Sequence, residues 1–176
     1  MVGIDGVQKA LYEFSAESPK LSITKGSTTT DDDHSAFKKL SGDGIVLLRG
    51  DLFDINASMT GGRFDTIIDW ASLVAIRPEL REQYADVMEK LIVPGGTMLL
   101  VSFDRRKGTD EARKTGPLYS MDKEEVRRLY EGPDWVSSVE KLEELDELEA
   151  NPGSVQRWKD QGIKSLFELC FLIRAK

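Results

Sequence analysis

The stretch FDTIIDWASLVAIRPELREQYADVMEKLIVPGGTMLLVSF, residues 64–103, decides the fold class. Residues 64–70 are mostly apolar and end beside an acid, which is typical of a buried strand. Pro94-Gly95-Gly96 precedes a second apolar run at 97–103. Between these runs, Pro78 suits the first position of a helix, and one face of 78–92 is apolar at helical spacing: Leu80, Tyr84, Val87, Met88, Leu91 and Ile92. The order strand, helix, strand predicts two parallel strands with the helix packed on them.

The same alternation extends to both ends of the chain. Further apolar runs predict strands at residues 2–5, 45–50 and 166–173. A β-hairpin is predicted from residues 36–40 and 45–49, which are joined by Ser41-Gly42-Asp43-Gly44. Helices are predicted at 122–131, with Ser120 as the cap, and from the stripe Val7, Ala10, Leu11 and Phe14. We therefore predict an α/β sheet with parallel strands, helices on both faces, and ligands at the carboxyl ends of the strands.

Two segments depart from this alternation. Residues 15–35 are polar and predict a loop or insertion. Residues 121–150 hold eleven acids and four Lys or Arg, an excess of seven (11 − 4). The spacing of their apolar residues leaves strand and helix both open: Val139, Leu142, Leu145 and Leu148. We interpret the acids as a solvated face rather than a docking surface, and we predict one domain over 1–176.

Composition excludes several classes of function. The 24 Lys and Arg against 31 Asp and Glu give a net charge of −7, which disfavours nucleic acid and anionic membranes as partners. Cys170 is the one cysteine, so no disulfide framework is expected, and its apolar run predicts a buried strand residue. His34, the one histidine, lies in a polar loop, so we expect no metal site and no catalytic triad. We expect a cytoplasmic monomer without a signal peptide or membrane span.

Acids recur where predicted strands end, at Asp5, Asp51 and Asp69. In doubly wound sheets, an acid at this edge accepts hydrogen bonds from the hydroxyls of a nucleoside ribose. A single Asp after a strand is more often a helix cap, so the argument depends on the three acids lining one crevice. The glycine-rich turn that usually accompanies such a site is absent from the sequence, because Gly61-Gly62 and Gly95-Gly96 are both typical of turns.

Four motifs, in order, resemble the thiopurine S-methyltransferase family. The most specific is LVAIRPELREQYADVM at 73–88, and the others are FDTIIDW at 64–70, GPLYS at 116–120 and RWKDQGIKSLFELCFLI at 157–173. The resemblance covers the chain from Val2 to Lys176. It implies a Rossmann-like class I methyltransferase sheet, with S-adenosylmethionine as cofactor and transfer of its methyl group to a small sulfur nucleophile.

The resemblance also implies roles for particular residues. Asp5 stands at the family's ribose-binding acid, and Asp51-Leu52 at the pair that contacts adenine. Asp69 and Trp70 fall at the cofactor edge, where Trp70 replaces the family's usual Arg. On the acceptor side the implied residues are Arg157, Gly116 and Pro117, with Leu118 replacing the second Pro of the family's G-P-P. No residue is implied as a catalytic base.

The front of the chain departs from the family pattern, because the lid helix, first strand and glycine loop of the family have no counterpart before Val2. We expect a sheet that lacks its central strand, and a strand at 2–4 that is poorly held or pairs with Ile67-Ile68 instead. Two interpretations remain open. One is a methyltransferase of the thiopurine type; the other is a catalytically inactive fragment or short isoform that acts only by binding a partner.

Overall fold

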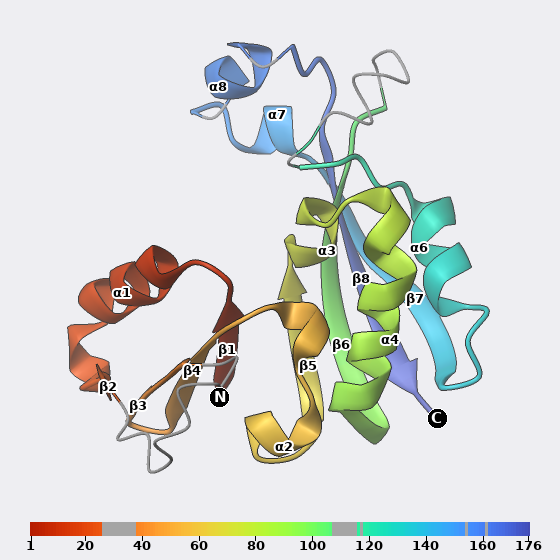
Figure 1. Ribbon diagram of the computed structural model, residues 1–176. Coiled ribbons are helices and arrows are strands. Elements are labelled where there is room, and N and C mark those ends of the chain that lie inside the picture. Colours follow the sequence, from red (N-terminus) through yellow and green to blue (C-terminus); the bar gives the residue numbers. More distant parts are fainter. Residues whose placement is uncertain (26–37, 107–115, 117, 154, 161) are drawn as a thin grey trace. The chain divides into compact units, whose positions relative to one another are not determined.

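The computed structural model describes residues 1–25, 38–106, 116, 118–153, 155–160 and 162–176 (Figure 1). The chain divides into two compact units, Met1–Gly62 and Arg63–Lys176. Each unit contains a sheet of four strands, in the order β1-β4-β3-β2 in the first unit and β5-β6-β8-β7 in the second. Both parallel and antiparallel pairs occur, so the predicted α/β class is confirmed and the sheets are mixed rather than wholly parallel.

The first unit pairs an amino-terminal strand with the predicted hairpin. Its β1 runs parallel to β4, which pairs antiparallel with β3, and the turn between β3 and β4 places Asp43 and Gly44 at φ values of 43° and 76°. Glycine and aspartate tolerate this left-handed backbone better than most residues. The core is formed by Leu11, Ile45 and Leu47. The elements are β1 (Val2–Asp5), α1 (Gln8–Glu17), η1 (Pro19–Leu21), β2 (Thr24–Lys25), β3 (Lys38–Gly42), β4 (Ile45–Arg49), η2 (Leu52–Asp54) and α2 (Ala57–Thr60).

The second unit contains the strand–helix–strand pattern of 64–103. In it β5 and β6 are parallel, whereas β8 is antiparallel to both β6 and β7. Helices α4 and α6 lie side by side on one face of this sheet (Figure 1). The elements are β5 (Phe64–Trp70), α3 (Ser72–Ala75), η3 (Pro78–Leu80), α4 (Arg81–Leu91), β6 (Ile92–Asp104), α6 (Lys123–Tyr130), β7 (Val136–Asp146), α7 (Glu147–Ala150), α8 (Val155–Asp160) and β8 (Phe167–Ala175).

The predicted apolar face of the helix is confirmed. Tyr84 and Leu91 are each 2% exposed, and Val87 and Met88 are buried with them. The helix packs on a sheet face whose side chains are also buried: Met98, Leu100, Leu169, Phe171 and Ile173. The predicted span 78–92 is one 3₁₀ turn followed by the α-helix from Arg81, and Ile92 already belongs to β6.

Several local predictions need correction. In the acidic segment, where the spacing of the apolar residues left strand and helix open, Val136–Asp146 form strand β7 between helices α6 and α7, and Leu142 in β7 is 49% exposed. Helix α6 is capped by Asp122, whose carboxylate accepts from the Glu125 amide at 2.9 Å, rather than by Ser120. Cys170 lies in β8 as predicted but is only half-buried. Gly95-Gly96 lies inside β6, at a shift of register, instead of ending the helix.

Strand β1 belongs to a different sheet from β5, so the expected pairing with Ile67-Ile68 is wrong, whereas the alternative of a poorly held strand stays a prediction. Strand β1 pairs with β4 from Val2 opposite Val46 to Asp5 opposite Arg49. Among the described residues, β1 and β5 each occupy one end of their own sheet. The absence of a central strand remains a prediction. Within the polar segment predicted at 15–35, residues 26–35, including His34, lie outside the described part of the chain.

We predict that Leu100→Ala lowers the free energy of unfolding by about 2–5 kcal/mol, because Leu100 is fully buried and truncation leaves a cavity in a packed core. Leu142→Ala is the matched control, since this leucine is 49% exposed and should lose under about 1 kcal/mol. Urea denaturation of both variants measures the difference. Equal losses would contradict the placement of the core between α4 and the sheet.

Candidate active site

Asp5 and Asp51 lie at the same edge of the first sheet. Asp5 is the last residue of β1, and Asp51 follows β4, the strand that runs parallel to it. The backbone joins the two strand ends directly, because the Gly50 amide donates to the Asp5 carbonyl at 3.2 Å. Two of the three predicted acids are therefore brought together at the carboxyl ends of neighbouring strands.

The carboxylates of both acids also stabilise the turns that follow them. One oxygen of Asp5 accepts from the Val7 amide at 2.6 Å, and one oxygen of Asp51 accepts from the Phe53 amide at 3.0 Å. Asp5 is half-buried and Asp51 is exposed, so neither is sealed from a ligand. Turn stabilisation occupies one Oδ atom of each acid in these contacts, and a carboxylate has further acceptor sites for a diol. Leu52, also half-buried, lies beside Asp51 at the start of η2.

Asp69 is placed differently, within the second unit. It is 1% exposed; Oδ1 accepts from the Ser72 and Leu73 amides at 2.8 and 3.3 Å, and Oδ2 accepts from the Tyr84 hydroxyl at 2.8 Å. Burial raises the pKa of the Asp69 carboxyl, and these hydrogen bonds oppose that rise. The carboxylate therefore satisfies the first two amides of α3 and holds α4 through Tyr84. A role for Asp69 toward a cofactor therefore remains a prediction, as does the convergence of all three acids.

Trp70, the next residue along β5, has its side chain on the opposite face of the strand from Asp69. The tryptophan is 68% exposed, and Ile68, two residues before it, is equally exposed. Residues two apart on a strand share one face, so Ile68 and Trp70 form a small apolar surface near the carboxyl end of β5. Contact between Trp70 and a cofactor remains a prediction.

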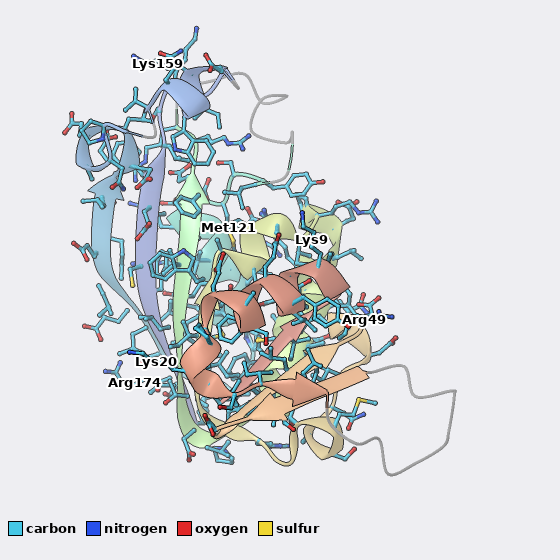
Figure 2. All side chains as sticks on the ribbon, turned by 90° about the vertical axis from the view of Figure 1, so that its left-hand side faces the viewer. Lys9, Lys20, Arg49, Met121, Lys159 and Arg174 are labelled. Carbon is cyan, nitrogen blue, oxygen red and sulfur yellow. The ribbon has the colours of Figure 1, made fainter. Side chains whose placement is uncertain are left out.

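The segment around Gly116 lies across the carboxyl end of β6. The Tyr119 amide donates to the Val74 carbonyl at 2.7 Å, and the Met121 amide donates to the Phe103 carbonyl at 2.9 Å. Between them, the Ser120 hydroxyl accepts from the Arg105 amide at 2.8 Å. A Cβ atom on Gly116 would collide with the Tyr119 ring, so glycine is required for this close approach. Met121, which is labelled in Figure 2, is fully buried.

A charged cluster centred on Arg106 holds the same end of the sheet together. Its guanidinium pairs with Asp104 at 2.9 Å and with Glu144 of β7 at 2.6 Å, and lies 3.8 Å from the centre of the Phe167 ring of β8. The hydrogen bond from Arg106, helped by Lys141, lowers the pKa of Glu144 from its ordinary value of 4.5 to about 2. This cluster links the ends of three strands: β6, β7 and β8.

The acceptor-side predictions are only partly placed. Gly116 is half-buried against Tyr119, whereas Pro117 lies outside the described residues. Arg157 belongs to α8, and its contact with an acceptor remains a prediction. The polar roles of Tyr84 and Arg81 were not predicted from the sequence, because an apolar stripe at helical spacing does not indicate which hydroxyl or guanidinium is buried beside it. Among the described residues, no group of His, Cys, Asp or Glu is suited to hold a metal ion, and no helix is long and apolar enough to span a membrane.

We predict that Tyr84→Phe lowers the free energy of unfolding by about 1–3 kcal/mol, because it removes a donor from the buried Asp69 carboxylate. Tyr130→Phe is the matched control. Its hydroxyl is equally buried but has no hydrogen-bond partner among the described residues, so its removal should be nearly neutral. Chemical denaturation distinguishes the two. A Tyr84→Phe protein as stable as Tyr130→Phe would mean that the Asp69 contact contributes nothing.

We predict a pH-dependent loss of stability in Glu144→Gln. Because the folded pKa of Glu144 is depressed, its ionised form stabilises the fold above its ordinary value of 4.5, and this contribution disappears as pH falls toward about 2. The side chain is 27% exposed, so solvent screening limits the effect to about 1 kcal/mol at pH 7. Unfolding measured between pH 7 and pH 2 should show the variant and the wild type converging. Glu89→Gln, on the exposed side of α4, is the control; a constant gap for Glu144→Gln at every pH would refute the assignment.

Similarity to known proteins extends over the whole chain. The thiopurine S-methyltransferase family model matches residues 1–176. Thiopurine S-methyltransferase from Nitrosospira multiformis is 33% identical over 140 residues, covering 80% of this chain and 58% of the relative. The enzyme of the same name from Rattus norvegicus is 31% identical over 176 residues, covering 100% of this chain and 67% of the relative. The chain thus spans about three-fifths to two-thirds of the length of these two relatives.

A solved structure supports the fold. The N-methyltransferase NodS from Bradyrhizobium japonicum WM9, in complex with S-adenosyl-L-homocysteine, superposes with a TM-score of 0.58 over 99% of this chain and 65% of that chain, at 14% identity. At this identity the similarity shows the fold alone. The family match, the ordered motifs and the methyltransferase fold lead to one conclusion: the chain belongs to the thiopurine S-methyltransferase family.

Proposed function

We propose that this protein transfers a methyl group from S-adenosylmethionine to a small sulfur nucleophile. The observation that carries the proposal is the family match over the whole chain, residues 1–176. That match favours an enzyme over the alternative of an inactive fragment or short isoform that acts only by binding a partner. We also propose that the protein acts as a cytoplasmic monomer on a small-molecule acceptor.

The residues at the first sheet edge suit the ribose of the cofactor. The Asp5 and Asp51 carboxylates are accessible, lie at adjacent strand ends, and retain acceptor capacity beyond their turn contacts. Leu52 is half-buried beside them and supplies apolar surface for the adenine ring. The adjacent polar and apolar groups therefore fit a nucleoside, with Asp5 as the principal hydroxyl acceptor.

The chain's own part in the reaction is to bind and orient. When bound, S-adenosylmethionine supplies an activated methyl group on a positively charged sulfur, so a thiolate can attack it without a catalytic base or metal. Arg157 would favour the anionic form of a sulfur acceptor through charge. Backbone hydrogen bonds from Tyr119 and Met121 hold the 119–121 segment at the carboxyl end of β6, where ligands bind in open α/β sheets. Positioning and exclusion of water are the contributions that remain for the protein.

We predict that the wild-type protein binds S-adenosylhomocysteine and that Asp5→Ala weakens binding by about tenfold to a hundredfold, because a charge-assisted hydrogen bond to the ribose is lost. Isothermal calorimetry measures both dissociation constants without requiring the acceptor to be known. Asp65→Ala is the matched control, since Asp65 is exposed and lies near the amino end of β5. Unchanged affinity in Asp5→Ala would remove Asp5 from the site, and no binding by the wild type would contradict the proposed function.

A further inference from the structure

Arg81 occupies a position that is unfavourable for a cation. It is the first residue of α4, where the helix dipole disfavours positive charge, and it is 0% exposed. A buried guanidinium costs free energy unless its donors are paired. An arginine in such a place needs specific partners, and another segment of the chain supplies them for Nη1 and Nη2, whereas Nε has no partner among the described residues.

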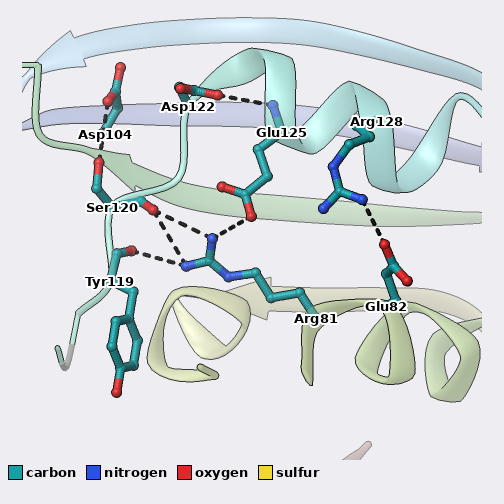
Figure 3. Close-up of polar contacts among 8 residues, drawn as sticks. All are labelled: Arg81, Glu82, Asp104, Tyr119, Ser120, Asp122, Glu125 and Arg128. Atoms are coloured by element: carbon teal, nitrogen blue, oxygen red, sulfur yellow. Dashed lines mark hydrogen bonds and ion pairs between the residues drawn. The ribbon is translucent and has the colours of Figure 1, made fainter. Parts of the chain in front are cut away.

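The partners of Arg81 are two backbone carbonyls and one carboxylate (Figure 3). Its Nη1 atom donates to Glu125 Oε1 at 2.7 Å and to the Ser120 carbonyl at 3.4 Å. Its Nη2 atom donates to the Tyr119 and Ser120 carbonyls at 3.4 and 3.5 Å. The planar fork of arginine can span these acceptors at once, which a lysine ammonium cannot reproduce.

These contacts hold the side of the 119–121 segment that faces α4. The amides of Tyr119 and Met121 bind α3 and β6, and the Ser120 hydroxyl contacts the end of β6, so Arg81 supplies the contacts from α4. The Tyr119 ring in turn lies against Gly116. A guanidinium buried beneath the segment thus controls where its backbone lies at the carboxyl end of β6.

We propose that Arg81 is a positioning residue for the acceptor: by holding the Tyr119 and Ser120 carbonyls it sets the wall against which the acceptor binds. This rests on the proposed function, because it assumes that the acceptor occupies the carboxyl end of β6. Arg81 itself touches neither substrate. Its loss changes acceptor binding and alignment while leaving the Asp5 and Asp51 edge intact.

The first test compares variants of the purified protein. Arg81→Lys keeps the charge but loses the fork, and we expect the acceptor KM to rise about tenfold or more while the dissociation constant of S-adenosylhomocysteine stays within about twofold. Glu125→Gln removes only the charged partner and should have a smaller effect. The matched control is Arg128→Lys, because Arg128 joins α6 to Glu82 of α4 at 2.7 Å on the surface, with side chains 56% and 76% exposed. An unchanged acceptor KM in Arg81→Lys, or equal effects of Arg81→Lys and Glu125→Gln, overturns the proposal.

The second test does not depend on activity. Hydrogen exchange at the Tyr119 and Met121 amides should become at least about tenfold faster in Arg81→Lys, with exchange in the middle of β6 unchanged. Equal exchange in wild type and variant overturns the positioning role, and faster exchange throughout the second unit means that Arg81 is only a stability residue and also overturns it. If wild-type protein transfers no methyl group, the proposed function fails while this measurement still decides whether Arg81 holds the segment.

Discussion

The second unit depends on one constraint: α4 covers the sheet while burying two polar side chains, and each must find a hydrogen-bond partner. Tyr84 donates to Asp69 at the end of β5, and Arg81 donates to the Tyr119–Ser120 backbone and to Glu125. Apolar burial sets the strength of packing but does not fix direction. The polar contacts add direction, because hydrogen bonds from Tyr84 and from Arg81 Nη1 and Nη2 require α4 to lie close to particular acceptors near the strand ends.

This constraint explains which parts of the fold could be predicted from sequence. The Leu80–Leu91 stripe and the apolar run at 64–70 follow local periodicity, so this helix and β5 were predicted at nearly the observed residues, whereas β6 begins at Ile92, five residues before the predicted start at 97. The acidic segment could not be assigned, because β7 is paired on one side by β8 and exposes most of its side chains, which gives no clean alternation of burial. The local sequence pattern also does not identify which strands pair. Strand β1 pairs with β4 rather than with β5, because strand pairing depends on contacts between residues that are distant in sequence.

The residues of the candidate site, like the strand pairing, could be predicted from the sequence only in part. The acids at Asp5 and Asp51 were found from strand ends alone, and the parallel pairing of β1 with β4 brings them to one edge. Asp69 has the same sequence signature, yet it is buried under Tyr84 and caps α3, because an acid after a strand serves equally well as a helix cap. Arg81 was hidden for the converse reason. A charged residue is normally expected at the surface. The burial of Arg81 becomes evident only when the structure shows that the Tyr119 and Ser120 carbonyls and Glu125 accept its hydrogen bonds.

We propose a methyltransferase in which side chains position the reactants and none acts as a base. Mass spectrometry of the product formed from methyl-deuterated S-adenosylmethionine and a small aromatic thiol tests it most directly. The account predicts that the whole labelled methyl group appears on the acceptor sulfur, with S-adenosylhomocysteine formed in equal amount. Binding of S-adenosylmethionine without any labelled thioether, across a panel of thiol acceptors, would contradict it.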